Sequence, residues 1–81
     1  MLIVYSKNGC PNCVSLITLL DEELIEYKVI KIDEDTEGAD FIKKRQHRSV
    51  PQVYKEGKLF VEGGYQGILK MWRSKSLKSS L

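Results

Sequence analysis

The chain has 81 residues, of which 42% are hydrophobic and 30% are charged. This composition is typical of a globular protein and excludes a disordered chain. The formal net charge of +2 excludes the strongly basic surface of a nucleic-acid-binding domain. Because the chain is too short for two hydrophobic cores, we expect one domain over residues 1–81, with a mobile tail after about residue 75.

Residues 2–5 form a short apolar run, which predicts a strand buried on both faces. Pro11 suits the first position of a helix, where the backbone N–H has no partner. The spacing that follows predicts a helix whose buried stripe contains Val14, Ile17, Leu20 and Leu24, widened by Leu16 and Leu19. Residues 26–33 predict a second strand. Strand, helix and strand in about 30 residues make a right-handed βαβ unit.

The second half of the chain predicts a polar turn over residues 34–38 and a short helix over residues 39–45. A two-stranded hairpin over residues 53–61 and a last helix over residues 68–77 follow. The order is therefore β-α-β-α-β-β-α. It predicts an α/β fold in which three helices flank both faces of a four-stranded mixed sheet. The apolar start of the chain is too short for a signal peptide or a membrane span, so we expect a cytoplasmic protein with no membrane partner.

Cys10-Pro11-Asn12-Cys13 lies between the first predicted strand and the first predicted helix, and the chain has no other cysteine. A C-x-x-C in that position is typical of a thioredoxin-type redox site. The thiolate is the reactive species, and the positive end of a helix dipole favours it at Cys10. Lys7 adds positive charge nearby. We predict that Cys10 attacks a substrate disulfide and that Cys13, less exposed and one turn into the helix, resolves the mixed disulfide.

Two cysteines at this spacing also occur in metal sites or by chance. A closed zinc site needs about four ligands, whereas the chain offers two cysteines and His47, which we expect at the surface. A metal-binding, copper-chaperone-like carrier is the rival function, because such carriers place a C-x-x-C at a loop-to-helix junction in a βαββαβ domain. Pro11 adds nothing to soft-metal capture, and the predicted order ends in a helix. We therefore expect no bound metal.

Val50-Pro51 is the second motif. A proline before a short strand marks an edge in the simplest interpretation. In this context we predict a cis Val50–Pro51 bond that leaves the Val50 backbone free to pair with a peptide-like ligand. The basic residues upstream form a solvated helix face or a site for an anionic partner. They are Lys43, Lys44, Arg45 and Arg48.

Two aromatic residues and a glycine pair are further candidates. Tyr5 and Tyr65 either line the groove beside Cys10 or pack in the core, as most aromatic side chains do. Gly63-Gly64 supplies the positive φ of a tight turn, the close approach of a ligand, or both.

These motifs together resemble the glutaredoxin family: Lys7, Cys10-Pro11-Asn12-Cys13, Ser49-Val50-Pro51-Gln52 and Gly63-Gly64-Tyr65. The resemblance extends from residue 2 to about residue 72. It implies a thioredoxin-like fold and a small monomeric thiol–disulfide oxidoreductase. Such an enzyme reduces protein disulfides or glutathione mixed disulfides, and some family members donate electrons to ribonucleotide reductase. It holds no cofactor and uses glutathione as co-substrate. Some family members form a glutathione-bridged iron–sulfur dimer. A proline after the first cysteine, here Pro11, is unfavourable to such a dimer, so we do not expect one.

The resemblance also implies the residues that bind substrate. Lys7 would face the glycine carboxylate of glutathione. Val50, beside the cis Pro51, would pair with the cysteinyl backbone. Gly64 and Tyr65 would hold the γ-glutamyl end.

Three positions depart from the family pattern. Asn12 stands where a tyrosine is usual and changes the surface of the site. Gln66 and Gly67 replace the Thr or Asp and the Asp that cap the last helix and bind the γ-glutamyl ammonium group, and Gln is a poorer cap. Thioredoxin reductase is therefore the alternative reductant, as in related glutaredoxin-like redoxins.

Overall fold

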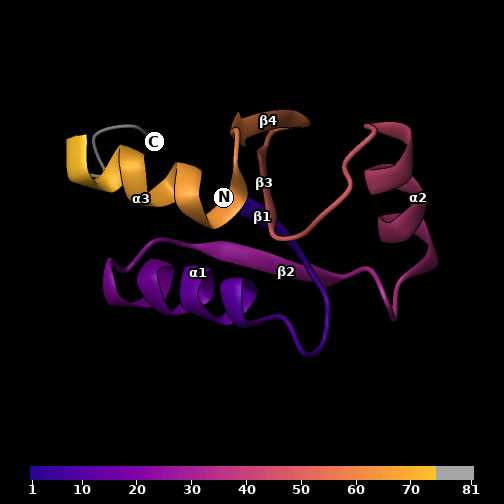
Figure 1. The fold of residues 1–81 in the computed structure, drawn as a ribbon, viewed down its shortest axis with the longest axis horizontal. Coiled ribbons are helices and arrows are strands. Elements are labelled where there is room, and N and C mark those ends of the chain that lie inside the picture. Colours follow the sequence, from indigo (N-terminus) through magenta and orange to yellow (C-terminus); the bar gives the residue numbers. More distant parts are fainter. Residues whose placement is uncertain (75–81) are drawn as a thin grey trace.

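The computed structural model describes residues 1–74, and its elements follow the predicted order. They are β1 (Leu2–Ser6), α1 (Pro11–Glu22), β2 (Tyr27–Lys31), α2 (Thr36–Lys44), β3 (Gln52–Lys55), β4 (Lys58–Val61) and α3 (Gly64–Ser74). This order differs from the βαββαβ of the rival carrier. The four strands form one sheet in the order β2-β1-β3-β4. Helices α1 and α3 cover one face of this sheet and α2 covers the other (Figure 1).

Strand pairing brings the two sequence motifs to one end of the sheet. β1 runs parallel to β2 and antiparallel to β3, with Tyr5 opposite Gln52. The end of β1 leads into the loop that carries Cys10, and Pro51 directly precedes β3. In an antiparallel pair the C-terminal end of one strand lies beside the N-terminal end of the other. The two motifs therefore meet, although about 40 residues separate them along the chain.

The α1 face is closed by aliphatic side chains. Its buried members come from two strands, two helices and the connection after α1: Leu2, Val4, Leu16, Leu20, Ile25, Val53 and Ile68. The α2 face holds a smaller, aromatic cluster of Tyr5, Ile42 and Tyr54, against which Phe41 packs. Alternating residues of β1 supply both clusters, as the period of a strand requires.

The predicted helix that begins at Pro11 exists, but its predicted buried stripe is only partly right, because Leu16 and Leu20 are buried whereas Val14 and Leu24 are not. Val14 is 64% exposed and Leu24 is 81% exposed. Cys13, which the predicted stripe did not include, is buried together with Leu16 and Leu20. The helix starts at Pro11 with Cys13 turned toward the sheet, which sets the phase of every later residue. Leu24 lies beyond the helix end with a φ of 57°, where helical periodicity no longer applies.

Two helices start earlier than predicted. α2 begins at Thr36 rather than residue 39, because the Asp35 side chain accepts a hydrogen bond from the Gly38 N–H at 3.0 Å and caps the helix. The predicted turn over residues 34–38 is correspondingly shorter. α3 begins at Gly64 rather than residue 68. Its expected extension to Leu77 and the expected mobile tail lie outside the described residues.

Among residues 1–74, no helix combines the length and the apolar character that crossing a bilayer requires.

Candidate active site

The two cysteines occupy the first turn of α1. Cys10 is the N-cap residue, with extended backbone (φ −107°), and its Sγ accepts a hydrogen bond from the Cys13 N–H at 3.2 Å. Both thiols are free. An N–H at a helix N-terminus that points at sulfur stabilises negative charge on it. The fold therefore places Cys10 where the nucleophile was predicted.

Cys13 is the more buried of the pair, at 2% exposed against 8% for Cys10. Burial raises the pKa of the Cys13 thiol above its ordinary value, and the hydrogen bond with Cys10 raises it further. Hydrogen bonds with the Ser6 side chain and the Lys7 backbone lower the same pKa to a smaller extent. The net result is a raised pKa for Cys13, and the two thiols differ in burial and in hydrogen bonding.

The Val50-Pro51 corner faces Cys10. The Val50–Pro51 peptide bond is cis, as predicted. The Cys10 Sγ–H donates to the Val50 carbonyl oxygen at a sulfur-to-oxygen distance of 3.8 Å. The side chain of Gln52 fixes the corner, since its Nε2 donates to the Ser49 carbonyl at 3.0 Å.

Gly64 closes the site from the side of α3. Its φ is 55°, and a Cβ added there would overlap the Pro51 carbonyl oxygen. Only glycine meets both conditions. The predicted candidates Cys10, Val50, Pro51 and Gly64 are thus brought together at one end of the sheet.

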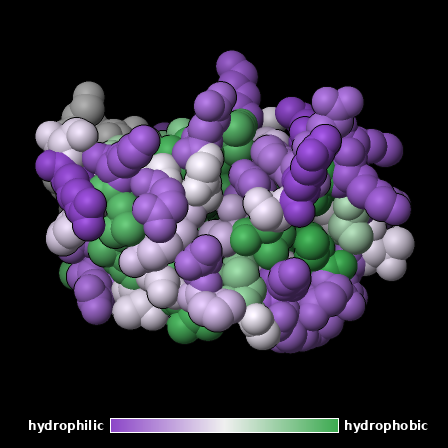
Figure 2. All heavy atoms as spheres, viewed as in Figure 1, coloured by the Kyte–Doolittle hydropathy of each residue, from purple (hydrophilic) through white to green (hydrophobic). Residues whose placement is uncertain are grey.

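Two hollows flank Cys10, and among residues 1–74 Lys7 alone lines both. The hollow on the α2 side, of about 270 Å³, includes the Val50 corner and the polar side chains of Lys43, His47, Arg48 and Asp40. The second hollow, of about 470 Å³, lies between α1 and β2 and includes Cys10 itself. Figure 2 shows hydrophilic side chains gathered over the α2 end of the molecule.

Two further predicted site residues, Asn12 and Tyr65, make no hydrogen bond with either thiol in the described structure. Asn12 is exposed on the second residue of α1. Tyr65 is half-buried against the aliphatic cluster and lines a shallow hollow with Val14 and Thr18. It lines neither of the hollows that contain Lys7.

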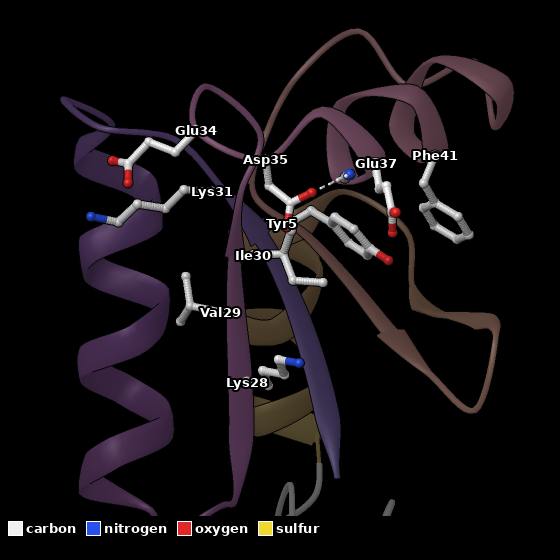
Figure 3. Close-up of a pocket in the computed structure, with 10 residues that line it drawn as sticks. Tyr5, Lys28, Val29, Ile30, Lys31, Glu34, Asp35, Glu37 and Phe41 are labelled. Atoms are coloured by element: carbon white, nitrogen blue, oxygen red, sulfur yellow. Dashed lines mark hydrogen bonds between the residues drawn. The ribbon is translucent and has the colours of Figure 1, made fainter.

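Tyr5 belongs to the core rather than to the groove beside Cys10. Its ring stacks on Phe41 with a centroid distance of 4.9 Å. Burial raises the pKa of the Tyr5 phenol above its ordinary value, and the nearby Tyr54 adds to this. Figure 3 shows Tyr5 directed toward α2 and Val29 directed toward α1, on opposite faces of the sheet. Tyr5 and Phe41 line a third hollow, of about 700 Å³, at the β2 edge.

His47 was expected at the surface, and this is only partly right. Its ring is half-buried, with Nε2 hydrogen-bonded to the Tyr54 hydroxyl at 2.7 Å. Tyr54 is 3% exposed, so its hydroxyl requires a partner, and His47 provides one. No periodicity links these two residues, because His47 lies in a connection outside any helix or strand.

Sequence reasoning also missed Asn8. Its backbone N–H donates to the Asp33 carboxylate at 3.1 Å, and its side-chain oxygen accepts from Lys31 Nζ at 2.9 Å. Its side-chain Nδ2 donates to the carboxylate of Glu34. Asn8 therefore ties the loop before Cys10 to the turn after β2. Its partners are 23 to 26 residues away in the chain, beyond the reach of a local motif.

Within residues 1–74, no three His, Cys, Asp or Glu side chains gather closely enough to hold a metal ion.

Comparison with protein families agrees with this geometry. The family model described as Glutaredoxin matches residues 2–60, which include both cysteines and the Val50-Pro51 corner. The chain belongs to the glutaredoxin family. Among curated relatives, glutaredoxin from Ricinus communis is 34% identical over 61 residues, covering 70% of this chain and 60% of the relative. Glutaredoxin 1 from Rickettsia conorii is 38% identical over 56 residues, which cover 65% of this chain and 55% of the relative. The chain thus spans 55–60% of the length of these relatives.

Solved glutaredoxin structures share the fold. A buckwheat glutaredoxin, solved as a complex with glutathione, superimposes with a TM-score of 0.81 at 28% sequence identity. The match covers 99% of this chain and 74% of the buckwheat chain. The thioredoxin-like glutaredoxin fold predicted from the motifs is therefore confirmed.

Proposed function

We propose that this glutaredoxin-family chain is a cytoplasmic thiol–disulfide oxidoreductase that acts on protein disulfides or glutathione mixed disulfides through Cys10 and Cys13. The observation that supports this most strongly is the difference between the two thiols. Cys10 Sγ accepts the Cys13 N–H at the start of α1. Cys13 is buried behind it, with a raised pKa.

The reaction transfers two electrons from the dithiol. The Cys10 thiolate attacks one sulfur of the substrate disulfide; a bond to Cys10 forms, the substrate S–S bond breaks, and the departing thiolate takes a proton from water. Cys13 then loses its proton to solvent and attacks Cys10 Sγ. A Cys10–Cys13 disulfide forms, and the second substrate thiol is released and protonated. The substrate is reduced and the dithiol is oxidised.

Regeneration of the dithiol requires a reductant, and glutathione is the proposed co-substrate. The hollow on the α2 side supports this, because Lys7, Lys43 and Arg48 offer cations for a carboxylate beside the Val50 corner. The Val50 backbone would pair with the cysteinyl part of glutathione, and Gly64 and Tyr65 would approach its γ-glutamyl end. Thioredoxin reductase is the alternative donor. Ribonucleotide reductase is a candidate among disulfide-bearing protein partners.

The test compares wild-type protein with Cys10→Ser and Cys13→Ser. Each is coupled to glutathione with glutathione reductase, and separately to thioredoxin reductase, while NADPH loss is followed. We expect Cys10→Ser to abolish turnover and Cys13→Ser to accumulate a mixed disulfide with a protein substrate. Ser15→Ala, a change elsewhere on α1, serves as the control and should retain full rate. Undiminished turnover by Cys10→Ser would refute the proposed function.

A further inference from the structure

The hollow between α1 and β2 differs in chemistry from its neighbour. Its walls are apolar and come from both elements: Pro11, Val14 and Ile17 on α1, and Val29 on β2. Cys10 and Cys13 also line it, and its polar rim comes from the exposed Lys7, Asn8 and Lys31, with Ser6 and Gly9 beside them. We call this hollow, of about 470 Å³, the apolar groove.

Val14 makes the groove unusual for a solvated surface. A single exposed apolar side chain needs no explanation, because much of any protein surface is apolar. Val14, however, is 64% exposed and continues a contiguous apolar lining that reaches the reactive thiol. The hollow on the other side of Lys7 has several charged side chains. The two sides of Cys10 therefore favour different ligands.

We infer that the apolar groove binds an apolar side chain next to the disulfide of a protein substrate. This inference rests on the proposed function, because it requires the substrate to be joined to Cys10. When a substrate cysteine is bonded to Cys10 Sγ, its neighbours follow at about 3.3 Å per residue along an extended peptide. These neighbours therefore lie beside the wall of the groove. An apolar neighbour that enters the groove covers Val14 and Val29 and removes apolar surface from water.

The experiment measures a single turnover, so it does not depend on which reductant serves the protein. Pre-reduced protein is mixed with a synthetic hexapeptide whose central cysteine carries a 2-mercaptoethanol mixed disulfide. One peptide has leucine on both sides of the cysteine and the other has serine. Acid quench and mass spectrometry give the second-order rate constant for each, and bis(2-hydroxyethyl) disulfide gives the rate for a substrate with no side chains.

We expect the leucine peptide to react about 10-fold faster than the serine peptide, in line with partial burial of one or two leucine side chains. Val14→Gln and Val29→Thr make the groove polar without adding charge beside the thiol, and each should reduce this preference to about 2-fold. Neither should change the rate with bis(2-hydroxyethyl) disulfide. Leu24→Gln is the matched control, since it replaces an exposed apolar residue just beyond the far end of α1 and should keep the full preference.

Equal rates for the two peptides with wild-type protein would overturn the inference, and so would a preference that survives in both groove variants. Loss of the preference in Leu24→Gln would overturn it as well, because any loss of surface apolarity would then suffice. If wild-type protein fails to reduce bis(2-hydroxyethyl) disulfide, the proposed function itself fails. The two failures are therefore distinguishable.

Discussion

The two faces of the sheet are built differently. Two helices cover the aliphatic face, and six of its side chains are at most 1% exposed. One short helix covers the aromatic face, where Tyr5, Ile42 and Tyr54 remain 3–8% exposed and the hollow at the β2 edge stays open (Figure 3). The buried thiol Cys13 lies on the aliphatic face, and His47 contacts the aromatic face. The comparison indicates that stability resides mainly under α1 and α3, whereas the α2 face contributes specific polar contacts.

Equal truncations on the two faces test this comparison most strongly. Leu16→Ala removes a fully buried side chain of the aliphatic face and should lower the free energy of unfolding by about 3 kcal/mol, through lost burial and the cavity left behind. Leu59→Ala removes the same atoms from a half-buried site on the aromatic face and should cost about 1 kcal/mol. Urea denaturation measures both. Equal losses would contradict the comparison.

The polar contact of the aromatic face is tested by removing one hydroxyl. Tyr54→Phe deletes the partner of His47 and should lower the free energy of unfolding by about 1 kcal/mol. Tyr27→Phe is the control, because its hydroxyl bonds to Asp21 at 2.7 Å at an exposed position. That change should cost less than about 0.5 kcal/mol. A Tyr54→Phe protein as stable as the control would show that the His47 contact is dispensable.

Each face of the sheet buries a weakly acidic side chain, the Cys13 thiol on the aliphatic face and the Tyr5 phenol on the aromatic face. Stability at alkaline pH therefore tests the two faces separately. Burial raises the pKa of Cys13 and of Tyr5, so each stabilises the fold while it is protonated. Such a contribution is complete below the unfolded pKa and is lost as pH rises through the folded pKa. Stability should therefore fall from about pH 8.5 upward through Cys13 and from about pH 10 upward through Tyr5.

Urea midpoints of reduced protein at pH 7.5, 9.5 and 10.5 measure this effect. Cys13→Ser should flatten the step between the first two values, and Tyr5→Phe the step between the last two. An unchanged slope in Cys13→Ser would show that other groups cause the lower step.

Sequence reasoning succeeded where local chemistry decides the structure. The apolar run before Cys10 and the proline after it were sufficient to place β1 and α1, and the order of elements identified the fold. It failed where distant contacts decide. The phase of α1 depends on Cys13 facing the sheet, so Val14 is exposed against expectation. The Asn8 hydrogen bonds join two loops, and the His47–Tyr54 pair crosses from a loop to β3. None of these follows from periodicity.

The glycines at the start of α3 decide how this scaffold can be redesigned. A side chain at position 67 would meet the carbonyl of Glu62, as one at position 64 would meet that of Pro51. An engineer who wished to install a carboxylate for an amino-group ligand therefore has both glycine positions closed by backbone. Gln66 between them is exposed and can accept the change.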